Sequence, residues 1–182
     1  MSDEGKITRR MLIAGIPGSL IMSPFLPTAG FAAGRSDTET DRLEKDGVTF
    51  DWRFDKGRFR ARMSAPTTGW LAAGLNSSIE LKDTYFVMLR IEDGTVEAQE
   101  RIAVSSGHRG TGALGYSPVL GHVAGREELG QTHVSFVLPM NLPGPRNINL
   151  REGAQVFLML AWSQEKDFTH HSAWRRHFEV TL

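Results

Sequence analysis

Cysteine is absent from this chain of 182 residues. Its absence excludes disulfides, thiolate zinc sites, iron–sulfur clusters, a cysteine nucleophile and the Cys-x-x-Cys-His attachment of c-type haem. Any metal site in this chain would therefore depend on histidine, methionine or carboxylate ligands.

The chain also lacks an excess of charge of either sign, since 21 basic residues balance 21 acidic residues. This balance gives no basis for binding nucleic acid or an anionic membrane surface. A phosphate-binding loop, a dinucleotide fingerprint and a strand–Gly-x-Ser-x-Gly–helix context are all missing. We therefore expect a binding domain rather than an enzyme; if it is redox-active, it would be an electron-transfer partner and not a catalyst.

Long hydrophobic runs are missing as well. The apolar stretch from Met11 to about Leu26 is interrupted by glycine, proline and serine, and it is too short to span a bilayer of roughly 30 Å. It follows the pair Arg9-Arg10 and precedes Gly30-Phe31-Ala32, a small-residue cleavage pattern. The segment resembles a twin-arginine-type export signal. We predict a bacterial signal peptide at residues 1–32, a periplasmic or secreted protein and no membrane span after cleavage, with a retained anchor as the alternative.

Residues 33–46 are polar and are predicted to form a flexible linker, and from Val48 onward the apolar pattern has a period of two. Residues 48–54 and 59–63 alternate around a turn at Asp55-Lys56-Gly57, which predicts a β-hairpin. Its polar face carries Arg58, Arg60 and Arg62, a stripe typical of a solvated surface.

Further short strands are expected, and Val156 to Trp162 is apolar enough for a central strand covered on both faces. The glycine-rich stretch from Ser105 to Gln131 is predicted to be a long irregular loop. Short strands without a helical pattern predict an all-β fold, an immunoglobulin-like β-sandwich of two mostly antiparallel sheets at residues 47–182. The remaining strands are expected at residues 70–75, 84–91, 95–104, 133–138, 154–163 and 176–182, with a turn at Glu92-Asp93-Gly94 between the second and the third of these.

Six histidines are present, and two of them, His170 and His171, are adjacent. In an extended chain neighbouring side chains point to opposite faces, so only one of the two could reach a given pocket. The alternative is a structural role, with one imidazole bonded to the backbone and the other in water.

Two stretches resemble the DOMON family, named after the N-terminal region of dopamine β-monooxygenase. The first is Gly69-Trp70-x-x-x-Gly74 followed by Asp83, and the second is Leu160-Ala161-Trp162 followed by Phe168 and the histidine pair. The resemblance implies a β-sandwich. In b-type cytochrome members, such as the cytochrome domain of cellobiose dehydrogenase, it also implies haem b held between a methionine and a histidine.

Carried over to this chain, the resemblance places the axial histidine at His170 or His171 and the methionine at Ile79, which cannot ligate iron. His108 and Met88 are the candidates for the second ligand, and five-coordinate haem on one histidine is the simplest arrangement that remains. Two alternatives stay open. One is a cofactor-free domain that binds a sugar or another periplasmic protein; the other is a His/Met copper site that uses His170 or His171 with His108. A periplasmic redox partner or a small ligand is the expected partner.

Overall fold

The computed structural model describes residues 40–182, so the predicted export signal at 1–32 and the linker up to residue 39 lie outside the described residues. The described chain forms strands and one 3₁₀ turn, with no helix that is long and apolar enough to cross a membrane. In chain order the elements are β1 (Asp41–Lys45), β2 (Val48–Asp55), β3 (Arg58–Ala65), β4 (Leu71–Asn76), β5 (Tyr85–Glu92), β6 (Thr95–Val104), β7 (Gly107–Gly110), η1 (Gly112–Leu114), β8 (Gly121–Glu128), β9 (Gln131–Pro139), β10 (Gln155–Trp162) and β11 (Trp174–Thr181).

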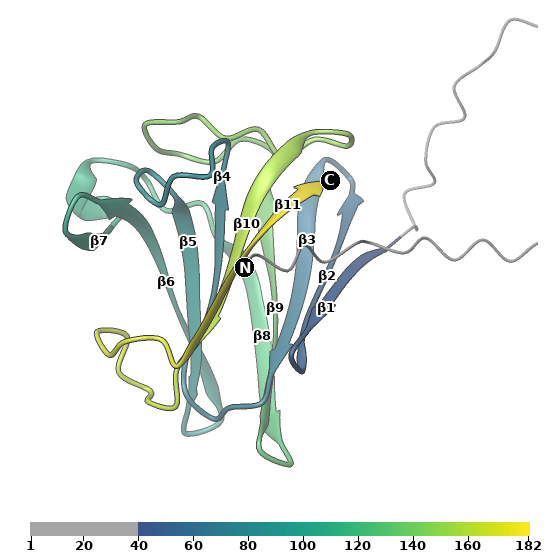
Figure 1. Ribbon diagram of the computed structural model, residues 1–182, viewed down its shortest axis with the longest axis vertical. Coiled ribbons are helices and arrows are strands. Elements are labelled where there is room, and N and C mark those ends of the chain that lie inside the picture. The colour runs from purple at the N-terminus through teal and green to yellow at the C-terminus, as the bar shows by residue number, and fades with distance from the viewer. Residues whose placement is uncertain (1–39) are drawn as a thin grey trace, which may run out of the picture. The chain divides into compact units, whose positions relative to one another are not determined.

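The strands form two antiparallel sheets that lie face to face (Figure 1). The five-stranded sheet has the order β1-β2-β3-β9-β8, and the six-stranded sheet has the order β11-β10-β4-β5-β6-β7. The predicted all-β sandwich is confirmed. The prediction of a central strand at Val156–Trp162 is also confirmed, because β10 lies between β11 and β4.

The main core fills the space between the two sheets. The alternation in β2 and β3 directs Phe50, Phe59 and Met63 inward, where they are buried against Leu75 and Leu158 from the six-stranded sheet. The intervening residues of β2 and β3 point outward, which confirms the arginine-rich polar face of the predicted hairpin. Burial of this apolar surface is the main stabilising contribution in a chain without disulfides.

Two-residue turns close the hairpins where the sequence predicts them. Lys56 and Gly57 between β2 and β3 have φ of 50° and 68°, and Asp93 and Gly94 between β5 and β6 have φ of 48° and 74°. Two consecutive positive φ values define the turn whose twist matches that of the flanking strands. These turns fix the register of the hairpins.

Two parts of the chain differ from the sequence prediction. Asp41–Lys45, expected to be linker, forms β1 because its backbone pairs with β2 while only Leu43 packs on the core. The stretch expected as an irregular loop contains β7, η1 and β8. Strand β8 is exposed, and its pairing with β9 is irregular between Gly121 and Ala124. An edge strand held mainly by backbone hydrogen bonds needs no apolar alternation, so the sequence pattern did not reveal it.

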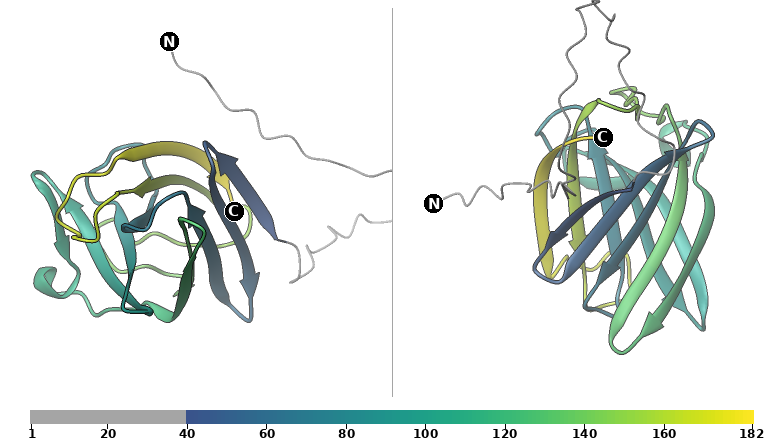
Figure 2. Two further views of the ribbon diagram at one scale, coloured as in Figure 1. Left: turned by 90° about the horizontal axis from the view of Figure 1, so that it is seen from below. Right: turned by 90° about the vertical axis from the view of Figure 1, so that its right-hand side faces the viewer.

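Specific contacts bring the edges of the two sheets together. On one side, shown in Figure 2, the end of β1 comes close to the start of β11, where Trp174 Nε1 donates to Asp46 Oδ2 at 3.1 Å. On the other side β8 approaches β6, where a Cβ on Gly125 would lie 3.2 Å from Val96 Cγ2.

A carboxylate, Glu100, is buried between the sheets. Its Oε1 accepts hydrogen bonds at 2.8 Å from the backbone N–H groups of Val119 and Leu120, and the Tyr85 hydroxyl also donates to it. Burial, together with the Glu100 carboxylate, raises the pKa of Tyr85 well above its ordinary value. Glu100 therefore anchors the chain after η1 to the interior of the sandwich.

Candidate functional site

The outer face of the six-stranded sheet is apolar. Eight residues on or beside this face, with side chains no more than 7% exposed, form a second hydrophobic cluster that is separate from the main core. An antiparallel sheet in a sandwich usually turns one face to water, so a buried cluster on that side is unusual. We call it the outer apolar cluster: Trp70, Ala72, Phe86, Met88, Ala103, Met159, Ala161 and Phe168.

Strand register explains why these residues share one face. Met159 lies opposite Gly74, and Gly74 lies opposite Phe86 on the next strand. A Cβ on Gly74 would lie 2.4 Å from Phe86 Cε1, so the ring occupies the space above the glycine. The absence of a side chain at this position in β4 therefore gives room to the large side chains of its neighbours.

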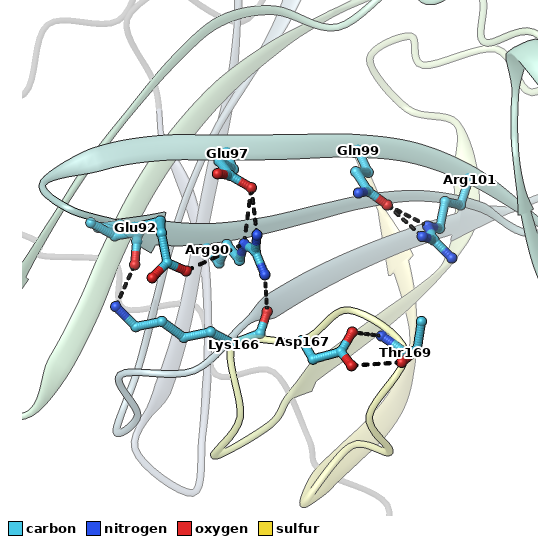
Figure 3. Close-up of polar contacts among 9 residues, drawn as sticks. Arg90, Glu92, Glu97, Gln99, Arg101, Lys166, Asp167 and Thr169 are labelled. Carbon is cyan, nitrogen blue, oxygen red and sulfur yellow. Dashed lines mark hydrogen bonds and ion pairs between the residues drawn. The ribbon is translucent and has the colours of Figure 1, made fainter.

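The loop between β10 and β11, residues 163–173, closes one end of this face; we call it the histidine loop. Arg90 on β5 donates to the Lys166 carbonyl at 2.9 Å and to Glu97 Oε2 at 2.7 Å (Figure 3). The Arg90 guanidinium also lies 5.0 Å from the centre of the Phe168 ring, and Lys166 Nζ donates to the Ile91 carbonyl at 2.6 Å. These contacts fasten the loop to the β5–β6 hairpin.

The Gly-Trp motif holds the other side of the histidine loop. A Cβ on Gly69 would lie 2.1 Å from the Ser163 carbonyl oxygen, so no larger residue fits without moving the loop. The Trp70 N–H donates to the Glu165 carbonyl at 3.1 Å, and the Ser163 N–H donates to the Trp70 carbonyl at 2.9 Å. Thr67 Oγ1 also donates to the Ser163 carbonyl at 2.5 Å. The two sequence stretches that carry the family resemblance are therefore in direct contact.

His170 and His171 both lie on the exposed side of the histidine loop. Their backbones are tied down: the His170 N–H donates to the Asp167 carbonyl at 3.0 Å, and the His171 carbonyl accepts from Ser163 Oγ at 3.1 Å. Neither imidazole takes part in a hydrogen bond within residues 40–182. Both rings therefore keep a nitrogen lone pair available for a ligand.

The carboxyl group of Asp167 shapes the same loop. It accepts hydrogen bonds from the Thr169 N–H at 2.9 Å and from the Thr169 hydroxyl at 2.8 Å (Figure 3). These bonds lower the pKa of Asp167, because they favour its charged form. The turn that precedes the histidine pair is thus stabilised by a carboxylate rather than by a neutral acid.

Met88 lies near the half of the face that the histidine loop covers. It is buried in the outer apolar cluster together with Phe168, and it is two residues along β5 from Arg90, which binds the loop. Two residues of a strand span about 7 Å. Of the two candidate second ligands, Met88 is therefore the one that the structure places beside the histidine loop.

His108 lies at the other end of the same face, on β7, with its ring centre 6.4 Å from that of Phe86. Its Nδ1 is 2.9 Å from Arg101 Nη1. Because a guanidinium can only donate, Nδ1 is the acceptor and Nε2 carries the proton. Burial, and then the charge of Arg101, lower the pKa of His108. Held in this way, His108 has no free lone pair for a metal ion.

The structure does not bring His108 together with the histidine pair, as the copper alternative would require. In the strand register His108 of β7 lies opposite Ala103 of β6. The histidine loop is bound by Arg90 of β5, which lies opposite Glu97 of β6. Ala103 lies six positions beyond Glu97 along β6, or about 20 Å away, and Figure 1 shows β7 and the loop at different ends of this strand. In the part of the chain that the structure describes, no three histidine or carboxylate residues gather as a metal site.

Ile79, the position that corresponds to the family's methionine, lies in the segment 77–84 between β4 and β5 and is 71% exposed. The buried amide of Asn76 shapes this segment by donating to the carbonyls of Glu80 at 2.6 Å and Lys82 at 3.2 Å. An exposed isoleucine contributes neither a ligand nor a wall to a cofactor site.

Sequence reasoning gave no role to His177, which lies on β11 directly opposite Met159 and therefore on the same outer face. Burial, and then the charge of Arg175, lower the pKa of His177. Its imidazole is thus favoured in the neutral form that metals require. The alternation that ends at the buried Val180 places residue 177 outward, but the pairing with Met159 follows only from the register of the two strands.

No protein-family model matches the sequence, and neither does any curated protein. Two solved structures are similar in fold. The cytochrome b domain of pyranose dehydrogenase from Coprinopsis cinerea has a TM-score of 0.60 and 13% identity, covering 77% of this chain and 80% of that domain. The cytochrome domain of Myriococcum thermophilum cellobiose dehydrogenase has a TM-score of 0.53 and 11% identity, covering 79% and 81%. The described domain therefore has the β-sandwich fold of these two cytochrome domains.

Proposed function

We propose that this domain binds haem b on the outer face of the six-stranded sheet, with His170 or His171 as the axial ligand, and that it serves in electron transfer or haem handling. The observation that carries the proposal is the outer apolar cluster, which lies directly beside a loop with two unengaged imidazoles. The shared fold with two cytochrome domains supports it.

The residues of this face fit the two basic requirements of haem, an apolar wall and one strong axial ligand. The outer apolar cluster would supply the wall once its buried side chains are uncovered, and the histidine loop would supply the imidazole. Met88 is the candidate for a second ligand, because Ile79 has no donor atom and the lone pair of His108 Nδ1 is occupied by Arg101. Haem, when bound, supplies one-electron redox chemistry.

The surrounding residues have separate tasks in this proposal. Phe86 and Met159 exclude water from the face, which lowers the local dielectric. Arg90 and Gly69 fix the position of the histidine loop from its two sides. The Ser163 hydroxyl, which donates to the His171 carbonyl, sets the backbone of the histidine pair.

The test is titration of the full chain with haemin, followed by visible absorption. We expect a saturable Soret band that one of the variants His170→Ala and His171→Ala abolishes while the other preserves it, because a single imidazole suffices as the strong axial ligand. His133→Ala, on the outer side of the other sheet, is the matched control and should leave the band unchanged.

Three results would overturn the proposal: no Soret band for the wild type, full binding by both variants, or loss of the band in His133→Ala. Loss of the band only in His177→Ala would overturn the assignment of the ligand to the histidine loop, since His177 lies on β11.

We further propose that the protein is exported by a twin-arginine-type signal. Arg9→Lys combined with Arg10→Lys keeps the charge, and it should leave the precursor unprocessed in the cytoplasm. Fractionation of bacterial cells followed by immunoblotting measures this. Normal periplasmic accumulation of the double variant would contradict the twin-arginine assignment.

A further inference from the structure

We propose that a groove across the outer face of the five-stranded sheet binds a small hydroxy-carboxylic acid of the sugar-acid type. This site is separate from the proposed haem site, because it lies on the other sheet.

The groove consists of two adjoining hollows. One has a volume of about 300 Å³ and is lined by residues of β2, β3 and β9, together with Thr40 and His122. The second has a volume of about 590 Å³ and extends toward β8. The two share Asp51, Arg62 and Ser135, so they form one continuous depression. Its size suits a monosaccharide-sized ligand.

The charges along this groove are not balanced. Arg60 is paired with Asp55 at 2.6 Å, and Asp51 lies 3.7 Å from Arg42. Arg53 and Arg62, which both line the smaller hollow, have no hydrogen bond or ion pair within residues 40–182. Asp51 lies directly opposite Arg62 in the strand register but forms no ion pair with it. Two guanidinium groups without an ion pair therefore face one depression.

Strand register places these arginines close together. Arg53 lies directly opposite Arg60, and Arg62 is the diagonal neighbour of Arg53 on the same face. Like charges opposite one another destabilise a sheet, and diagonal neighbours are about 7–8 Å apart. A bound anion would relieve this repulsion. Guanidinium groups bind planar carboxylates through two parallel hydrogen bonds, so a carboxylate is the anion that fits.

The other lining groups indicate that the anion also carries hydroxyls. Asp51 Oδ1 is buried and accepts no hydrogen bond, and Ser135 adds a hydroxyl beside it. The Asp51 carboxylate would repel the carboxylate of an acid without hydroxyl groups, but it would accept a hydrogen bond from a hydroxyl group of the ligand. The aromatic residues of the lining, Trp52 and Phe136, belong to the main core between the sheets, so they present no ring face for stacking a neutral sugar. A ligand with both a carboxylate and hydroxyl groups would find a partner for each of these groups, the arginines as well as Asp51 and Ser135.

The test is isothermal titration calorimetry of the full chain at low ionic strength with D-galacturonate, D-galactose, succinate and inorganic phosphate as probes. We expect saturable binding of galacturonate, at least tenfold weaker binding of succinate and phosphate, and no binding of galactose. Arg53→Gln and Arg62→Gln should each weaken galacturonate binding at least tenfold.

Arg58→Gln is the matched control, because Arg58 is an exposed arginine on β3 and on the same face but outside the groove. It should change binding by less than twofold, and circular dichroism checks that each variant keeps its fold. Asp51→Asn should reduce the preference for galacturonate over succinate.

Absence of galacturonate binding, phosphate binding as tight as galacturonate, or an equal effect of Arg58→Gln and Arg62→Gln would overturn the proposal. Since haem uptake is read from the Soret band and this ligand from heat, either proposal can fail without the other.

Discussion

The outward faces of the two sheets differ in chemistry. On the five-stranded sheet the outward residues include Arg53 and Arg62, which line an open groove. On the six-stranded sheet the corresponding positions carry Phe86, Met88 and Met159, which are buried. The first face is the ordinary solvated side of an antiparallel sheet, whereas the second is built like a core.

This difference shows that the six-stranded sheet is buried on both sides. One side packs on the five-stranded sheet, and the other is covered in part by the histidine loop, with Phe168 inserted into the outer apolar cluster. Apolar side chains on an outer face favour binding of an apolar group there, and uncompensated arginines favour an anion. The proposals of haem for the six-stranded sheet and of a carboxylic acid for the five-stranded sheet follow from this contrast.

The largest expected effect is that of removing the ring of Trp70, which belongs to the outer apolar cluster. If this face is core-like, Trp70→Ala should reduce the free energy of unfolding by about 3–5 kcal/mol. Urea denaturation followed by circular dichroism measures the change. A loss below about 1 kcal/mol would mean that the face is an ordinary surface.

A smaller effect is expected where the sheet meets the histidine loop. Gly69→Ala places a Cβ against the Ser163 carbonyl and should cost about 1–3 kcal/mol, the usual range for overpacking. Hydrogen exchange of the Ser163 and Glu165 amides should also become faster. Gly110→Ala is the control, because a Cβ there meets no atom within 4 Å. Equal effects of the two variants would contradict a specific contact at Gly69.

Tyr85, buried between the two sheets beside Glu100, predicts that the free energy of unfolding depends on pH. The pKa of Tyr85 is raised from its ordinary 10.0, so above pH 10 the unfolded chain loses a proton that the folded chain keeps. The contribution of Tyr85 to stability should therefore be constant below pH 10. Above pH 10 the free energy of unfolding should fall by up to about 1.4 kcal/mol per pH unit. Urea unfolding from pH 9 to pH 11 measures this slope. Tyr85→Phe should make the slope shallower, and an unchanged slope would contradict the assignment.

The smallest effect is expected on the arginine face. Arg62 is partly exposed and makes no hydrogen bond or ion pair within residues 40–182, so Arg62→Ala should change the free energy of unfolding by less than about 0.5 kcal/mol. The same urea assay measures it. A loss comparable to that of Trp70→Ala would remove the contrast between the two faces.

Much of the fold could be predicted from local patterns. The alternation in β2, β3 and β9 and the turns at Gly57 and Gly94 were predicted, because period two and positive φ are properties of short segments. Strands β1, β7 and β8 were missed. They lie at or near sheet edges, and their backbone partners are what define them.

The candidate site was predictable only in part. An all-β chain without thiol chemistry, a Gly-Trp motif and an adjacent histidine pair can be recognised in the amino-acid sequence alone. The packed sheets are needed to see that Gly69 supports the histidine loop, that His108 and the histidine pair lie at different ends of one face, and that His177 faces Met159. They are also needed to see that Arg53 and Arg62 share a groove. The physical reason is that alternation fixes which way a side chain points along its own strand, whereas its neighbours depend on strand order and register, which are set by contacts distant in sequence.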